Sequence, residues 1–65
     1  MDTIEKIKKI VNRGKVVITC MDENPKRIWV SFSLDEDAWW DYSVGHSIEE
    51  AVEDIFSRLK KNKVI

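Results

Sequence analysis

The 65-residue chain is short of several features that would assign it to a class at once. It has one cysteine, so no disulfide can form within the chain and the usual staple of small secreted domains is missing. It has one proline and two glycines, and neither glycine belongs to a glycine-rich phosphate loop. No apolar run approaches the roughly 20 residues that cross a bilayer, and the N-terminal MDTIEKIKKIV has no signal-peptide core. We therefore expect a cytoplasmic protein that does not associate with a membrane.

The short length also argues against an enzyme. A chain of this size forms one domain, residues 1–65, and buries only about 60% of the surface that its unfolded form exposes. A deep catalytic cleft is not expected in such a core. Cys20 is predicted to be a buried small hydrophobe, and His46 is the only histidine. We expect no catalytic residues, no metal site and no cofactor.

The near-neutral net charge of −1 conceals an uneven distribution along the chain. Residues 1–20 carry a net charge of +3, residues 21–34 are balanced, and residues 55–65 carry +4. Residues 35–54 carry eight acids and no lysine or arginine, and this acidic block also contains Trp39, Trp40 and Tyr42. The eight acids are Asp35, Glu36, Asp37, Asp41, Glu49, Glu50, Glu53 and Asp54.

Apolar spacing predicts a helix at each end of the chain. Residues 3–13 carry isoleucine and valine at helical intervals, with Asp2 or Thr3 as the cap and Gly14 as the stop. The C-terminal helix begins at the capping box of Ser47 and Glu50, and its apolar stripe runs to Leu59.

Between the helices the apolar period changes to two, which predicts three strands joined by tight turns at residues 22–26 and 35–37. The side chains expected to face the core are Val16, Ile18, Cys20, Ile28, Val30, Phe32, Leu34, Trp40, Tyr42 and Val44. Those expected to face outward are Val17, Thr19, Met21, Trp29, Ser31, Ser33, Trp39, Asp41 and Ser43. Because paired residues share a face, Phe32 should lie opposite either Trp40 or Tyr42 and not opposite Asp41.

These elements predict an α+β domain of order α-β-β-β-α. The sheet is a three-stranded antiparallel meander, both helices cover its apolar face in a two-layer arrangement, and the other face is open. Trp29 and Trp39 are expected on that open face as two separate anchors, since exposed tryptophans are favoured at interfaces. The acids have a local explanation as well, because Asp35–Asp37 suit a turn and the later acids suit a helix N-terminal half.

Three families share features with the chain. The α-β-β-β-α order resembles the double-stranded-RNA-binding domain, which binds RNA through its first helix, its first strand loop and lysines at the start of its last helix. Here that helix start reads Ser47-Ile48-Glu49-Glu50, acidic where phosphate binding needs positive charge. The segment YSVGHSIEEAVEDI, residues 42–55, resembles a strand–Gly–helix step of HicB-type antitoxins.

The size, the element order and the acidic turns also resemble small phage-encoded anti-CRISPR proteins. One group of these inhibitors uses acidic side chains to occupy a groove meant for DNA. This resemblance implies partner-binding roles for Asp35, Glu36, Asp37 and Asp41, together with Glu49 and Glu50.

The resulting prediction is a protein-binding inhibitor or interaction module, a nucleic-acid mimic whose acidic hairpin and helix start occupy a basic groove of a partner protein. Trp39 or Trp29 would supply an apolar anchor. Nucleic-acid binding is the alternative, through the basic residues Lys6, Lys8, Lys9, Arg13, Lys60, Lys61 and Lys63. A third alternative is an antitoxin-like scaffold or a homodimer through the open sheet face or the edge of the first or third strand.

Overall fold

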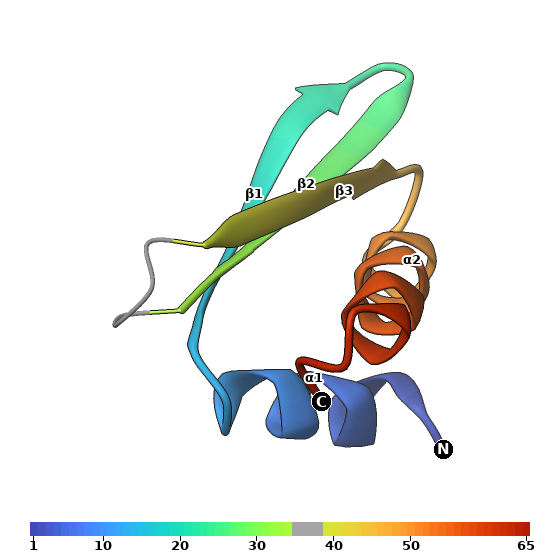
Figure 1. Cartoon of the computed structure of the whole chain (residues 1–65). Helices are drawn as coiled ribbons and strands as arrows, with labels where there is room; N and C mark the ends of the chain where they lie inside the picture. Colours follow the sequence, from blue (N-terminus) through green and yellow to red (C-terminus); the bar gives the residue numbers. More distant parts are fainter. Residues whose placement is uncertain (35–38) are drawn as a thin grey trace.

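The computed structural model describes residues 1–34 and 39–65. Its elements are α1 (Thr3–Val11), β1 (Lys15–Glu23), β2 (Lys26–Ser33), β3 (Trp40–Gly45) and α2 (Ile48–Lys61), shown in Figure 1. The strands form one antiparallel sheet in the order β1-β2-β3. The predicted α+β class and the α-β-β-β-α order are confirmed.

Both helices begin at the side-chain caps that the sequence supplies. The Asp2 carboxylate accepts a hydrogen bond of 2.8 Å from the Glu5 backbone N–H, so Asp2 and not Thr3 caps α1. The Ser47 hydroxyl accepts one of 3.1 Å from the Glu50 backbone N–H at the start of α2. Each bond satisfies a backbone donor that the first helical turn leaves without a partner.

The first hairpin is longer than predicted. The strands β1 and β2 pair as far as Glu23 and Lys26, so the turn contains only Asn24 and Pro25, which are joined by a cis peptide bond. The register shifts between Cys20 and Asp22, where β1 carries one extra residue. This β-bulge places Asp22 opposite Arg27, and the two side chains form an ion pair.

The core lies where α2 packs against β2 and β3, and α1 contributes from beside α2. Figure 1 shows α1 crossing below α2, at the end of the sheet where β1 begins. Ile10 of α1 is 1% exposed and joins the same cluster. The buried apolar residues are Ile10, Ile28, Val30, Phe32, Ala51, Val52, Ile55, Phe56 and Leu59. Burying each of the larger side chains contributes about 1.5–3 kcal/mol.

The face assignment of β3 predicted from the sequence is wrong. Phe32 pairs with Asp41, and Ser43, expected outside, is 1% exposed in the core. Trp40, Tyr42 and Val44, which were expected in the core, lie on the open face instead. The reason is a close approach of α2, because a Cβ atom on the buried Gly45 would lie 2.7 Å from the Ala51 backbone nitrogen. At Ser43 and Gly45, only small side chains fit between the strand and the helix.

The distal part of β1 also differs from the prediction. Val16 packs against the core, but Ile18 and Cys20, expected inside, are exposed. The hairpin of β1 and β2 extends beyond the helices in Figure 1, so the helix-facing side of β1 has no layer over it there. The expectation of a buried cysteine is therefore wrong.

Candidate binding surface

Three aromatic side chains stack on the open face of the sheet. The rings of Trp29 and Tyr42 lie 4.6 Å apart between centroids with their planes 9° from parallel. The rings of Trp40 and Tyr42 are 5.9 Å apart at 23°. Trp29 pairs with Val44, so Tyr42 is its diagonal neighbour across the two strands. We call Trp29, Tyr42 and Trp40 the aromatic row.

The aromatic row is accessible to a partner. Trp40 is 59% exposed and Tyr42 is 41% exposed, while Trp29 is half-buried beneath its neighbours. Exposed Val17 and Val44 share the open face. Together these side chains offer on the order of 400 Å² of apolar surface, a size that on a monomer often marks an interaction site.

Trp39 does not belong to this surface, contrary to the sequence prediction. It is half-buried, packs against the core, and meets the Phe32 ring edge-on at 6.2 Å between centroids. Trp29 lies on the open face as expected. It is a member of a stack rather than a separate anchor, and its partners, Tyr42 and Trp40, were expected in the core.

The acids of the predicted site differ in their surroundings, because some are paired with basic side chains and others are exposed. Asp41 is half-buried and forms an ion pair of 3.4 Å with Arg58, and Asp54 forms one of 3.0 Å with the same guanidinium. Glu53 is paired with Lys6. Glu49 and Glu50 are exposed in the first turn of α2. The remaining predicted acids, Asp35, Glu36 and Asp37, lie outside the described residues.

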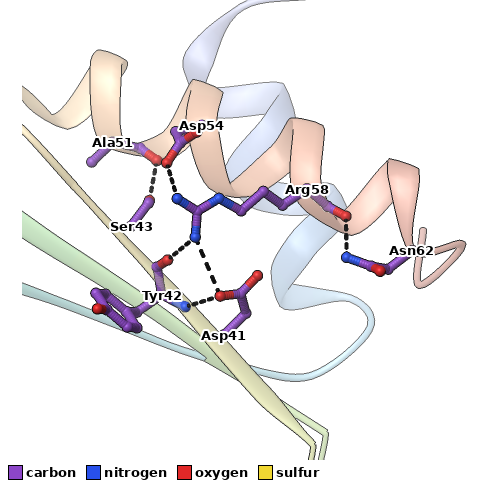
Figure 2. A network of polar contacts seen from close by, with 7 residues as sticks. All are labelled: Asp41, Tyr42, Ser43, Ala51, Asp54, Arg58 and Asn62. Carbon is purple, nitrogen blue, oxygen red and sulfur yellow. Dashed lines mark hydrogen bonds and ion pairs between the residues drawn. The ribbon is translucent and has the colours of Figure 1, made fainter.

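Arg58 joins α2 to β3, as Figure 2 shows. Besides both carboxylates, its guanidinium donates a hydrogen bond of 2.7 Å to the Tyr42 backbone carbonyl. The Tyr42 backbone N–H in turn donates to the Asp41 carboxylate at 2.8 Å. The Asp41 carboxylate therefore stabilises the contact between β3 and α2. No sequence pattern pointed to Arg58, which lies outside the acidic block.

The two basic ends of the chain come together in space. The ammonium groups of Lys6 and Lys60 lie 5.7 and 5.6 Å from the centroid of the Phe56 ring, a distance typical of cation–π contacts. The Arg13 side chain donates a hydrogen bond of 2.7 Å to the Val64 carbonyl. The α1 helix and the last turn of α2, both rich in basic residues, therefore lie next to each other.

Cys20 and His46, the two side chains with the most reactive groups, each form a hydrogen bond of their own. The Cys20 thiol donates to the Glu23 carboxylate at 3.4 Å, and this hydrogen bond raises the pKa of Cys20, which disfavours the nucleophilic thiolate. His46 is bonded through Nδ1 to the Lys26 carbonyl at 3.0 Å. In residues 1–34 and 39–65, no group of three or more His, Cys, Asp and Glu side chains is placed to hold a metal ion.

A hollow of about 390 Å³ lies beside the second helix and is lined by Leu34, Trp39, Asn62 and Val64. These four side chains include no acid, base or nucleophile, so they offer no group for covalent or acid–base chemistry. None of the described helices is long and apolar enough to cross a membrane. Comparison of the chain with protein-family models, curated proteins and solved structures finds no match in any of the three.

Proposed function

We propose that this chain is a non-catalytic binding domain that recognises a partner protein through its open sheet face. The aromatic row is the observation that carries the proposal. Tryptophan and tyrosine are enriched at the energetic centres of protein interfaces, and here Trp40 and Tyr42 are exposed on the sheet. Trp40, at the exposed end of the row, is the expected anchor.

The stacking geometry favours a protein over nucleic-acid bases on this face. Sheets that bind single-stranded nucleic acid offer aromatic rings with free faces for the bases. The Tyr42 ring stacks with both Trp29 and Trp40, which leaves less of it available to a base. The exposed aromatic side chains and the adjacent valines suit the apolar centre of a protein interface.

The acids of this domain extend the proposal to a partner with a basic, nucleic-acid-binding groove, and the domain would then act as an inhibitor. Exposed Glu49 and Glu50, with Asp35, Glu36 and Asp37, would supply its negative charge. Asp41 would contribute less charge to that contact, because it is half-buried and paired with Arg58.

Affinity capture with matched variants tests the proposed surface. The immobilised chain is compared with Trp40→Ala and with Ile4→Ala, a control at an exposed apolar position on α1. A true partner is retained by the wild type and by the control, and Trp40→Ala weakens its binding by about 30-fold or more, the loss expected for an interface hot spot. Equal retention by all three chains would exclude the aromatic row as the interface.

The contribution of the acidic residues to binding is tested separately, after a partner has been identified. The double variant Glu49→Gln/Glu50→Gln should slow association and reduce its salt dependence, because exposed charges act mainly on the encounter rate. The same measurement on Asp35→Asn/Asp37→Asn tests the other part of the acidic surface. Unchanged association rates in both variants would remove the basic groove from the proposal and leave the aromatic row.

Nucleic-acid binding is a second candidate, and the joining of the two basic ends in space favours it. Fluorescence anisotropy with a labelled RNA duplex at low and moderate salt gives the test. Binding that weakens steeply with salt and is lost in Lys8→Ala/Lys9→Ala would support this candidate, since phosphate contacts depend on counterion release. The absence of binding at low salt would dismiss it.

A further inference from the structure

The two edges of the sheet differ in how their backbone groups are protected. At the β3 edge the Tyr42 carbonyl accepts from Arg58 and the Tyr42 N–H donates to Asp41, both shown in Figure 2. Those side chains occupy the outward groups of Tyr42, in the middle of the edge, which an additional strand would need. Protection of this kind prevents edge-to-edge association. The β1 edge has a different character.

The pairing register shows which β1 groups point outward. In an antiparallel ladder the N–H and C=O of one residue point to the same side, and the side alternates along the strand. The groups of Tyr42 point away from β2, so those of its partner Ser31 point toward β1. Ser31 also pairs with Val17, so Val17 is bonded to β2. By alternation, the groups of Val16, Ile18 and Cys20 point outward from the β1 edge.

The β1 edge has few of the features that prevent an edge strand from pairing with another chain. Between Lys15 and Asp22 the strand carries no proline and no charged side chain, and its segment VVITCM is rich in β-branched and apolar residues. Ile18 is 41% exposed on the helix-facing side, where the helices do not reach it. An apolar side chain on an edge strand, with outward backbone groups and no cover, is suited to pairing with another strand.

We propose that β1 pairs antiparallel with β1 of a second copy of this chain, about a two-fold axis perpendicular to the sheet. Because Met21 is the extra residue of the bulge, Asp22 takes the place next to Cys20 in the ladder. With Ile18 on the axis, Val17 then lies opposite Thr19 of the second copy and Lys15 opposite its Asp22. This geometry makes one continuous six-stranded sheet.

Charge complementarity selects this register and a second copy as the occupant. Lys15 and Asp22 both lie on the open face, since they pair with Ser33 and Arg27 of β2. The two-fold axis therefore places opposite charges together twice and sets no like charges directly opposite each other. On the helix-facing side the exposed Ile18 meets its own copy, flanked by Val16 opposite Cys20. The chain is complementary to itself at this edge.

Disulfide trapping tests the axis directly. In a Cys20→Ser background, Ile18→Cys places two thiols in a hydrogen-bonded pair, where Cα atoms are about 5.5 Å apart, within the range that a disulfide spans. The expected product under mild oxidation is a covalent dimer of twice 7.7 kDa. Val44→Cys in the same background, exposed on β3, is the matched control and should remain monomeric. A dimer from Val44→Cys with none from Ile18→Cys would overturn the proposal.

Sedimentation of the reduced chain, from about 5 to 500 μM, tests association without a covalent bond. The wild type should show reversible dimerisation. Ile18→Lys should abolish it by placing two ammonium groups at the axis, whereas Ile4→Lys, on exposed α1, should not. Lys15→Glu should weaken the dimer about tenfold, because two attractive cross-strand pairs become repulsive. A strictly monomeric wild type, or a dimer that Ile18→Lys leaves intact, would overturn the proposal.

Discussion

Replacing Ser43 with valine tests the packing of β3 against α2. The Ser43 hydroxyl is buried and donates a hydrogen bond of 2.6 Å to the Ala51 carbonyl, visible in Figure 2. Valine removes this bond, which costs about 1 kcal/mol, and adds a second branch where the helix lies close. Overpacking of a filled core costs a further 1–3 kcal/mol or so. We expect Ser43→Val to reduce the free energy of unfolding by about 2–4 kcal/mol in total.

That loss is a large share of the stability of so small a domain. A chain of 65 residues is expected to have a free energy of unfolding of about 3–10 kcal/mol. The melting temperature should therefore fall by about 10–25 °C. Urea unfolding followed by tryptophan fluorescence measures the same change as a lower midpoint with an unchanged slope.

Ser31→Val is the matched control for this experiment. Ser31 lies on the open face opposite Tyr42, where valine is a favourable strand residue, so its substitution should change stability by less than about 0.5 kcal/mol. If β3 instead faced the helix with its large side chains, Ser43 would lie outside and Ser43→Val would be neutral or stabilising. Equal stability of the two variants would refute the register described here.

Three further perturbations probe other parts of the molecule. Leu59→Ala removes a fully buried side chain of α2 and should cost about 2–5 kcal/mol in urea unfolding; a loss below about 1 kcal/mol would contradict its central place in the core. Gly14→Ala introduces a Cβ atom 2.8 Å from the Phe32 ring, so we expect a loss of at least about 1 kcal/mol, and a melting temperature equal to that of wild type would contradict this close approach. Cys20 should be alkylated by iodoacetamide with a pH midpoint above that of an ordinary thiol, because its hydrogen bond to Glu23 favours the protonated form and raises its pKa. Glu23→Gln should lower that midpoint, and an unchanged pH profile would contradict the role of this bond.

The elements of the fold could be predicted from the sequence because local signals determine them. The capping residues Asp2 and Ser47 begin the helices where expected. The apolar face of β2 is also as predicted, since Ile28, Val30 and Phe32 alternate with polar or amphipathic residues in a strand that has a neighbour on both sides. In that strand, hydrophobic patterning and burial agree.

The face of β3 could not be predicted from alternation alone. Its large residues alternate with Asp41 and Ser43, and the usual rule places the large ones inside. The deciding factor is a distance between two elements, since α2 approaches β3 too closely for large side chains. The small residues Ser43, Gly45 and Ala51 were the available signal. The aromatic row was missed for the same reason.

The prediction for β1 was wrong because the alternation of apolar residues along a strand does not indicate how much of that strand the helices cover. Ile18 and Cys20 have the parity of core residues, but they lie beyond the helical layer. Likewise, the count of acids could not show that Arg58 and Lys6 would form ion pairs with three of them. Asp54 and Arg58 are one helical turn apart, but the pairs Lys6–Glu53 and Asp41–Arg58 join residues that are distant in sequence and follow only from the tertiary structure.

The reach of the first hairpin beyond the helices has a consequence for hydrogen exchange. Amide protons opposite the core, as at Val30, exchange only when the whole domain unfolds, whereas those near the Asn24–Pro25 turn need only a local opening. The hairpin end is held by its own ladder and by the Asp22–Arg27 ion pair, not by the packed layer. Opening of the hairpin end therefore requires less free energy than unfolding of the domain, and its amide protons should exchange first.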